Sequence, residues 1–403
     1  MVGDVVVGFL RAGGEVLLCR QVADTNASDG RWGVPSGTVE GESSADDVAY
    51  GIQREWATGD AALVRVGDPV TVGESRLHPY LFDCESNETS EGIDSEWVHA
   101  TEIRRRETRD GLWRAYRAVS PTVGSVREDR THGSAYVSVR ALEVLRDRAG
   151  EGADWSALVE RATALLEARP SMAALENRVN RAMTGASGTE NAAVLERAAR
   201  EGIDRALAAD GRAAGNAAEH VSGTVLTLSR SGTVEEALSV GDLDRVIVLE
   251  SRPNREGVDV AERLVDALDV TVTLDAAVAH VMEGVDSVLV GADTVLADGS
   301  VINKVGTRTA AVAAAHEGVP VYAVAAVDKI SPSSEPVLES VDRGALTDDE
   351  RVAVECPLFD RTPPDLVTGV ITEEGVLATT GIAQRATEHA RRSRWKEPNG
   401  STG

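Results

Sequence analysis

The stretch GADTVLADGSVINKVGT, residues 291–307, separates a short apolar run from an alanine-rich segment with helical periodicity. The apolar run covers residues 287–290, and the helical segment covers residues 307–316. A strand that gives way to glycine and polar residues, followed by a helix, is typical of the connections on which open α/β sheets carry ligands. We therefore predict that this stretch is a strand-end loop at a binding site within an α/β domain.

The same alternation continues on both sides of this stretch. We predict buried strands at residues 224–228, 245–249, 270–274, 287–290 and 320–325. Helical patterns alternate with them at residues 234–238, 258–268, 276–282 and 307–316. Nearly continuous apolar strands separated by helices are typical of a parallel sheet that is covered on both faces. Residues 221–390 are therefore predicted to form a doubly wound, Rossmann-like α/β domain.

The preceding residues have a different pattern of apolar and polar residues. Residues 131–220 carry helical periodicity, with helices expected at 191–209 and 213–220, and are predicted to form a helical subdomain. Residues 1–119 alternate short β-like runs with turns and are predicted to form a separate domain. The polar segment 120–130 is predicted to be a linker, and residues 391–403 a flexible tail.

The charge balance of the chain is strongly acidic. Its 403 residues include 41 Lys and Arg against 66 Asp and Glu, which gives a formal net charge of -25. The lysines are restricted to Lys304, Lys329 and Lys396. Excess carboxylates with arginine in place of lysine favour a halophilic protein, because concentrated salt screens the repulsion between them. Binding of nucleic acid through a broad basic face is not expected at this charge.

Several other classes of protein are also disfavoured. No apolar run approaches the ~20 residues that a membrane helix needs, and the first residues do not begin a signal peptide, so we expect a cytoplasmic protein without a membrane partner. Cys19, Cys84 and Cys356 are odd in number and far apart, which argues against a disulfide framework or a structural zinc site.

Polar residues gather where the predicted strands end. Ser229-Arg230-Ser231-Gly232-Thr233 follows the first strand, Glu250-Ser251-Arg252 the second, Asp275 the third, and Asp293 and then Asn303-Lys304 the fourth. Strand ends of a parallel sheet share one edge, so we predict a site there for a small anionic, hydroxyl-bearing ligand. Helix capping would equally account for Ser229 and Thr233, and a surface ion pair for Glu250 and Arg252. We expect Lys304 to contribute charge rather than packing.

The region from about Arg130 to Ala390 resembles the alpha, beta and delta subunits of translation initiation factor 2B. The resemblance extends to ribose-1,5-bisphosphate isomerase and methylthioribose-1-phosphate isomerase. It rests on residues 291–307 and on Arg169-Pro170-Ser171-Met172, Glu250-Ser251-Arg252-Pro253 with Gly257, and Phe359-Asp360-Arg361-Thr362-Pro363-Pro364. It implies self-association through the α/β domain and a pocket for a sugar phosphate or nucleotide. The implied ligand-binding residues are Arg169, Ser229, Arg230, Ser231, Gly232, Thr233, Glu250, Arg252, Asp293, Asn303 and Lys304.

The resemblance also bears on catalysis. It implies that Asp293 is the aspartate of the isomerases, whereas Thr227-Leu228-Ser229 stands where they have Thr-His-Cys. A thiol titrates near ~8.5 and exchanges protons far more readily than a serine hydroxyl. Their Arg-Gly-Ala motif is replaced by His132-Gly133-Ser134-Ala135. We therefore interpret the chain as a regulatory, non-enzymatic sensor with a link to the translation initiation machinery. The alternative is a sugar-phosphate isomerase that uses Asp293 and Ser229.

Residues 1–119 resemble a Nudix domain. The resemblance rests on residues 30–37, on Glu40-Gly41-Glu42, on Arg54-Glu55 before Gly59, and on Glu96-Trp97-Val98 with Leu112-Trp113. It implies an α/β/α sandwich in which glutamates hold Mg²⁺ against a diphosphate. The Glu-Glu pair that follows Arg-Glu in the Nudix box is absent, which leaves Glu42 and Glu55 as metal ligands only if the domain is active. A Nudix hydrolase of a nucleoside diphosphate derivative is thus a third hypothesis, beside an inactive module. No other cofactor is predicted.

Overall fold

The structure is a computed structural model that describes residues 3–20, 30–88, 94–336 and 343–396 of the chain. The chain divides into two compact units. The first unit comprises residues 1–125 and 143–154, and the second comprises residues 126–142 and 155–403. Helix α4 (Ser134–Gly150) contributes residues to both. No helix among the described residues has the length and apolar character that crossing a membrane would require.

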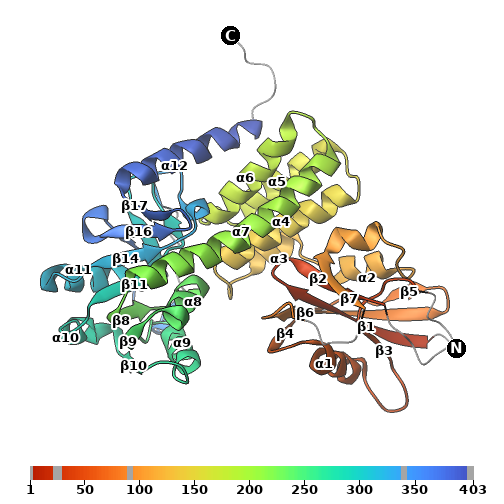
Figure 1. The fold of residues 1–403 in the computed structure, drawn as a ribbon, viewed down its shortest axis with the longest axis horizontal. Helices are drawn as coiled ribbons and strands as arrows, with labels where there is room; N and C mark the ends of the chain where they lie inside the picture. The colour runs from red at the N-terminus through yellow and green to blue at the C-terminus, as the bar shows by residue number, and fades with distance from the viewer. Residues whose placement is uncertain (1–2, 21–29, 89–93, 337–342, 397–403) are drawn as a thin grey trace, which may run out of the picture. The chain divides into compact units, whose positions relative to one another are not determined.

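A mixed sheet forms the centre of the first unit (Figure 1). Its main strand order is β4-β6-β1-β2-β7, with β3 paired to β1 and β5 paired to β6. The pair β1 and β6 is parallel, and the other paired strands are antiparallel. The strands are β1 (Gly3–Ala12), β2 (Glu15–Cys19), β3 (Ser36–Thr38), β4 (Ala61–Val66), β5 (Val70–Val72), β6 (Ser75–Cys84) and β7 (Ser95–His99).

Helices cover both faces of this sheet. Neighbouring strand residues point to opposite faces, so Phe9 packs in the cluster that contains α2 (Leu112–Val119), whereas Leu10 packs in the cluster that contains α1 (Ala45–Trp56). The short helix η1 (Ala100–Arg104) leads from β7 towards α2. The kinship of this layered unit to Nudix domains stays a prediction.

Two segments differ from the boundaries predicted above. The predicted linker, 120–130, contains helix α3 (Val123–Glu128), which begins at a reciprocal pair in which the backbone N–H groups of Thr122 and Ser125 donate to each other's hydroxyls at 2.9 and 3.0 Å. In the predicted tail, α12 (Thr379–Arg392) runs past residue 391 into η6 (Ser393–Lys396). There Trp395 Nε1 donates to Asn180 Oδ1 at 2.9 Å, which ties this end to the helical part of the second unit.

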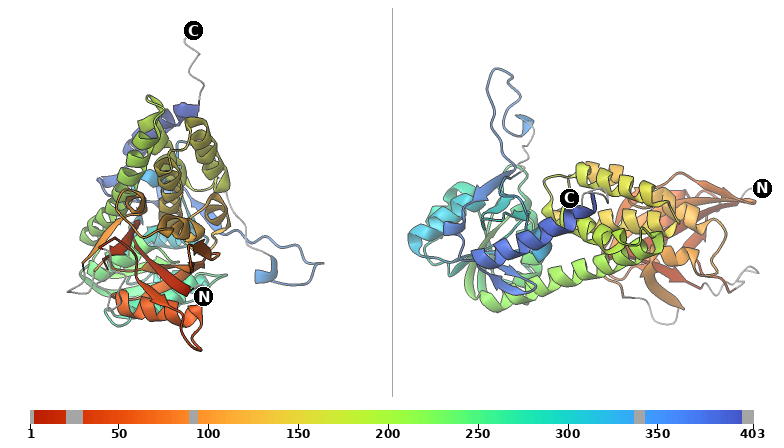
Figure 2. Two further views of the ribbon diagram at one scale, coloured as in Figure 1. Left: turned by 90° about the vertical axis from the view of Figure 1, so that its right-hand side faces the viewer. Right: turned by 90° about the horizontal axis from the view of Figure 1, so that it is seen from above.

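The helical part of the second unit contains α5 (Trp155–Ala168), α6 (Ala173–Ser187) and α7 (Ala192–His220), together with the start of α4. Figure 2 shows α7, in light green, as one uninterrupted helix, where the sequence pattern had predicted two. Ala209, Ala213 and Ala214 are all buried, so the apolar stripe continues across the predicted break. Asn191 caps the start by accepting from the N–H groups of Ala193 and Val194.

The α/β part of the second unit is built on a seven-stranded sheet in the order β10-β9-β8-β11-β14-β16-β17. All neighbouring pairs are parallel except β16 with β17. The predicted strands are present as β8 (Gly223–Leu228), β9 (Leu243–Leu249), β10 (Val270–Thr273), β11 (Ser287–Gly291) and β14 (Val321–Val324). Strand β16 (Gly369–Thr372) and the edge strand β17 (Gly375–Leu377) were not predicted.

Helices pack on both faces of this sheet (Figure 1). One core includes buried residues of α7, α8 (Gly232–Val240) and α9 (Glu256–Leu264). The other includes residues of α10 (Val278–Val281), which follows η2 (Asp275–Ala277), and of α11 (Thr307–Glu317) and α12. The mixed α/β fold with a doubly wound parallel sheet is thereby confirmed.

The stretch 291–307 is more ordered than a simple loop. Its residues form β12 (Thr294–Val295) and β13 (Val301–Lys304), which pair antiparallel around a turn at Gly299, where φ is +89°. Strand β15 (Phe359–Thr362) pairs with β13 and completes a small sheet. The short helices η3 (Val327–Lys329), η4 (Arg343–Ala345) and η5 (Pro364–Leu366) lie in the remaining connections. Asn303 and Lys304 therefore project from a paired strand.

Candidate functional site

A cavity of about 780 Å³ opens at the carboxyl ends of β8 and β11 in the second unit. The connection after β8 and the stretch after β11 both line it, as the parallel-sheet prediction requires. Most of the predicted ligand-binding residues meet there, namely Arg169, Ser229, Arg230, Ser231, Gly232, Thr233, Asp293, Asn303 and Lys304.

Glu250 and Arg252, which were also predicted to bind the ligand, do not line the cavity. Arg252 is exposed, and Glu250 Oε2 lies 3.5 Å from Arg255 Nε. Asp275 fixes their loop, because its carboxylate accepts from the backbone N–H groups of Ser251 and Arg252 at 2.8 and 2.6 Å. Asp275 is thus hydrogen-bonded to backbone N–H groups and does not line the cavity. Asn254, Glu256 and Asp259 line the cavity from this side instead.

The connection after β8 has a defined local geometry. Ser229 has a positive φ of 63°, and its backbone N–H donates to Ser251 Oγ at 2.6 Å. Ser231 is the N-cap of α8, with its hydroxyl oxygen 3.5 Å from the N–H of Val234, so the alternative in which Ser229 or Thr233 caps this helix is wrong. A Cβ at Gly291 would lie 2.8 Å from Ser231 Oγ, so only glycine lets β11 approach this loop. Ser231, Gly232 and Thr233, at the start of α8, line the cavity.

Two lysines are buried at the cavity. Lys304 is 4 % exposed, and its Nζ lies 2.7 Å from Glu256 Oε1. Contrary to our expectation, this lysine is part of a buried ion pair as well as a source of charge. Lys329 is 6 % exposed and donates from Nζ to the carbonyl of Ala292 at 2.7 Å, next to Asp293. The scarcity of lysine in this chain singles out Lys329 after the fifth predicted strand, although Lys329 was not among the predicted ligand-binding residues.

The segment before α4 is held by two of the predicted arginines. Arg169 donates to the carbonyl of Asp129, and Arg230 donates to the carbonyl of Thr131. His132 lines the cavity and stacks on Tyr136 with ring centroids 4.0 Å apart. Burial alone would raise the pKa of Asp129, but hydrogen bonds from the N–H groups of His132 and Thr131 outweigh it and lower the pKa. The sequence did not identify Tyr136, because its place in the cavity lining beside His132 depends on how the segment before α4 folds.

The remaining polar groups complete the polar lining of the cavity. Asn303 Nδ2 donates to Thr307 Oγ1 at 3.0 Å, and Thr307 in turn donates to the carbonyl of Lys304 at 2.7 Å, which fixes the Asn303 amide. Guanidinium and ammonium groups beside hydroxyls and the half-buried Asp293 suit an anion that also carries hydroxyl groups. None of the three cysteines lines the cavity.

The predicted magnesium ligands of the first unit do not belong to a cluster of possible metal ligands among the described residues. Glu42 and Glu55 are both exposed. In residues 3–20, 30–88, 94–336 and 343–396, no three His, Cys, Asp or Glu side chains are grouped as a metal site would require. The nearby carboxylates have other partners, because Asp47 forms a capping box with Ser44 and Asp46 accepts from the Tyr80 hydroxyl at 2.6 Å. These residues do not fit the Mg²⁺ that an active Nudix domain implies.

Known proteins match the second unit. The sequence pattern described as Initiation factor 2 subunit family matches residues 130–379. A ribose 1,5-bisphosphate isomerase from Haloterrigena turkmenica is 32% identical over 292 residues, covering 64% of this chain and 89% of that protein. A methylthioribose-1-phosphate isomerase from Stutzerimonas stutzeri is 29% identical over 323 residues, covering 70% and 90%.

Among solved structures, the translation initiation factor eIF-2B of Pyrococcus horikoshii is similar, with a TM-score of 0.56 and 27% identity. The similarity covers 63% of this chain and 94% of that one. The matched residues, 130–379, include every residue that lines the cavity. The chain therefore belongs to the initiation factor 2 subunit family.

Proposed function

We propose that the cavity binds a sugar phosphate or a nucleotide and that the chain is a regulatory sensor rather than an isomerase. The observation that carries the proposal is the meeting of Ser229, Asp293 and Lys304 at one cavity. The cation and the carboxylate suit a phosphorylated, hydroxyl-bearing ligand. Ser229 occupies the position at which the resemblance implies the cysteine of the isomerases, and its hydroxyl is a much weaker acid than a thiol.

The similar proteins support the class of ligand. Relatives that cover this region are named for isomerases of ribose 1,5-bisphosphate and methylthioribose 1-phosphate, both phosphorylated pentoses. The cavity offers arginine and lysine side chains on several sides, from Arg169, Arg230, Lys304 and Lys329. A ligand with a phosphate at one or both ends would use these cations, while Asp293 would accept from its hydroxyls.

Calorimetric titration of the full-length protein tests this function. Ribose 1,5-bisphosphate, ribose 5-phosphate and AMP would be added separately at fixed salt, and each mixture would be examined for products by ³¹P NMR. We expect saturable binding of at least one ligand without conversion. If none of the three ligands binds, the sensor is refuted. If a ligand binds the Lys304→Met variant as tightly as the unmodified protein, its binding site is not this cavity.

An isomerase is the second candidate, because Asp293 lines the cavity and the relatives above bear that activity in their names. Conversion of ribose 1,5-bisphosphate by the unmodified protein would establish it in place of the sensor. Self-association through the α/β region and a link to the translation machinery belong to the proposal as predictions, which sedimentation and co-purification would test. The salt requirement would be tested by unfolding at low salt.

A further inference from the structure

Lys329 places a buried amine without a carboxylate partner at the cavity of the second unit. The residue is 6 % exposed and lines the cavity. Its Nζ donates to the carbonyl of Ala292 at 2.7 Å, and within the described part of the chain this amine takes part in no ion pair. Lys304, the other lysine of the cavity, lies 2.7 Å from a carboxylate oxygen of Glu256. The two lysines therefore differ, because Lys304 has a charged partner and Lys329 a neutral one.

Lys329 stands at the end of β14, next to the strand end that carries Asp293. Strands β11 and β14 are parallel neighbours in the sheet, with Gly291 opposite Val324. The short helix η3 follows β14 and ends at Lys329, and Ala292, whose carbonyl accepts from Lys329, is directly followed by Asp293. Both Lys329 and Asp293 line the cavity. An amine and a carboxylate are therefore offered to a ligand from adjacent strand ends.

The backbone on both sides of Lys329 is fixed by side chains of helix α6. Asn177 Nδ2 donates to the carbonyls of Asp328 and Ile330, both at 2.8 Å. The Asp328 carboxylate in turn accepts from Arg178 Nε at 3.2 Å. The Lys329 side chain therefore starts from a fixed position, which lowers the entropy lost when its amine engages a ligand.

From these contacts we propose that Lys329 captures the carbonyl carbon of an open-chain sugar phosphate as a Schiff base. Lysines that are shielded from water are the ones that proteins use to react with carbonyl compounds. The inference rests on the proposed function, because it requires a sugar phosphate in this cavity. It narrows the ligand to a phosphorylated aldose or ketose, since only a sugar with an aldehyde or ketone group reacts with an amine. Lys304 remains to bind the phosphate.

The atoms of this step balance without any co-reactant. Directly or through one water, the Asp293 carboxylate takes a proton from the Lys329 ammonium. The Nζ lone pair then forms a bond to the carbonyl carbon while the C=O π electrons move to the oxygen, and Asp293 carries protons from nitrogen to that oxygen. The C–O bond breaks, the oxygen leaves as water, and the nitrogen lone pair forms the C=N bond. Overall, an ammonium and a carbonyl give an iminium and water, and hydrolysis releases the sugar phosphate again.

Reductive trapping in the full-length protein tests this step. Ribose 5-phosphate, whose open-chain form has an aldehyde group, would be added with cyanoborohydride at fixed salt, and the digested protein would be mapped by mass spectrometry. We expect a saturable adduct on Lys329 with the mass of the sugar phosphate less one oxygen. The lysines of the chain are Lys304, Lys329 and Lys396, so the site of attachment is read directly from the peptides.

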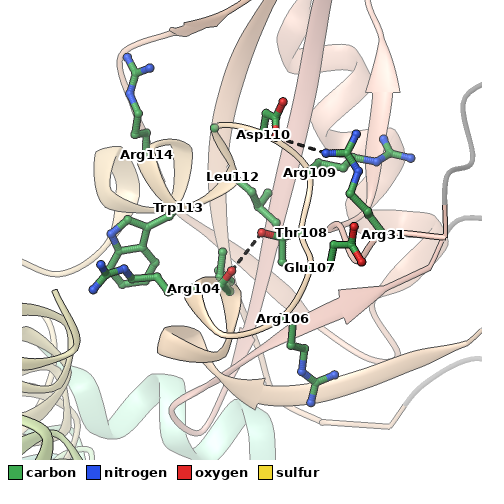
Figure 3. A pocket seen from close by; sticks show the side chains of 12 residues that line it. Arg31, Arg104, Arg106, Glu107, Thr108, Arg109, Asp110, Leu112, Trp113 and Arg114 are labelled. Carbon is green, nitrogen blue, oxygen red and sulfur yellow. Dashed lines mark hydrogen bonds and ion pairs between the residues drawn. The ribbon is translucent and has the colours of Figure 1, made fainter.

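Two controls separate this adduct from other reactions of the chain. The pocket of the first unit shown in Figure 3 is lined by arginines and by no lysine among the described residues, and a guanidinium has no free amine lone pair to attack a carbonyl. Lys396 is exposed and outside the cavity, so its labelling should rise in proportion to the sugar concentration without saturating. Ribitol 5-phosphate has the phosphate but no carbonyl group, and it should suppress labelling of Lys329 without forming an adduct.

The decisive mapping uses the unmodified protein and does not depend on the folding of a variant. As a second measurement, Lys329→Met should abolish the saturable adduct and weaken binding of ribose 5-phosphate more than binding of ribitol 5-phosphate, whereas Lys396→Met should leave both unchanged. Calorimetric binding of ribose 5-phosphate without an adduct would overturn the Schiff base and leave the proposed function standing. If neither sugar phosphate binds, both proposals are overturned. A saturable adduct on Lys304 in place of Lys329, or labelling confined to Lys396, would also overturn the inference.

Discussion

Arg11 and Glu143 are 132 positions apart in the chain, yet Nη1 of Arg11 lies 3.3 Å from Oε2 of Glu143, and both side chains are buried. Arg11 also binds Asp83 with Nε and Nη2 at 2.6 and 2.8 Å. Nearby, Arg146 donates to the carbonyl of Gly14 at 2.8 Å and to the Tyr116 hydroxyl at 3.0 Å. The later half of α4 thus completes the charged core of the first unit.

Replacement of Arg11 should destabilise the first unit strongly. Arg11→Met leaves Glu143 and Asp83 without this cation, and a buried ion pair that loses one partner costs about 3 kcal/mol or more. Urea unfolding followed by tryptophan fluorescence would measure the loss. Arg105→Met is the control, because its ion pair with Glu102 is partly exposed and should contribute less than about 1 kcal/mol. Equal midpoints for the two variants would contradict a stabilising role of the buried pair.

Asp328 should give the second unit an acid-dependent stability. Burial alone would raise the pKa of Asp328, but hydrogen bonding to Arg181, supported by the charge of Arg178, holds it well below 3.8. Because the folded-state pKa is depressed, the stabilisation is complete above about pH 4 and is lost as the pH falls towards the folded-state value.

Asp328→Asn should therefore lower the free energy of unfolding by about 3 kcal/mol at pH 7. The difference from the unmodified protein should shrink below about pH 4, because the Asp328 carboxyl group of the unfolded chain takes up a proton there while that of the folded chain stays ionised. Urea titrations between pH 7 and pH 3 would measure it. Asp349→Asn, at an exposed pair with Arg351, should leave stability nearly unchanged. A difference for Asp328→Asn that stays constant to pH 3 would exclude this titration.

The ion pair between Lys304 and Glu256 should control ligand affinity at the cavity. Glu256→Gln removes the carboxylate that competes with phosphate for the Lys304 ammonium, so we expect severalfold tighter binding of ribose phosphates. Lys304→Met should weaken binding at least about tenfold and also lower stability, since Glu256 loses its partner. The double variant should recover stability without recovering affinity. Calorimetry and thermal melting together separate the two effects.

Ser229→Cys should introduce slow isomerisation of ribose 1,5-bisphosphate if the rest of the cavity retains its chemistry. A thiol at this position can exchange protons that a hydroxyl cannot, and positioned acid–base groups contribute about 100-fold or more to such rates. Product formation would be followed by ³¹P NMR. The activity should vanish in Ser229→Cys/Asp293→Asn, and Ser231→Cys should remain inert. Activity that persists without Asp293 would count against the assigned pair.

Local patterns in the sequence predicted the core of the α/β domain. The apolar runs of β8, β9, β11 and β14 are largely buried because strands inside a parallel sheet must be apolar on both faces. The predicted burial of residues 270–274 was wrong, because β10 lies at the edge of the sheet and exposes Val272 and Leu274. From their order, the polar residues that follow β8 and β11 could be expected at one edge, and they do line one cavity. Strands β16 and β17 are short, and their few residues carry too little pattern to reveal them.

The sequence by itself therefore determined the family, the α/β class and most of the residues at the cavity, because these depend on local periodicity and on motifs in fixed order. Only the tertiary structure decided which polar groups line the cavity and which partners they have. The Asp275 carboxylate accepts a hydrogen bond from the backbone of a neighbouring loop, and Arg252 is exposed to solvent. Lys304 forms an ion pair with Glu256. The partners of a polar side chain are chosen by long-range packing, which brings together residues as distant as Arg11 and Glu143 and leaves no signal in either local sequence.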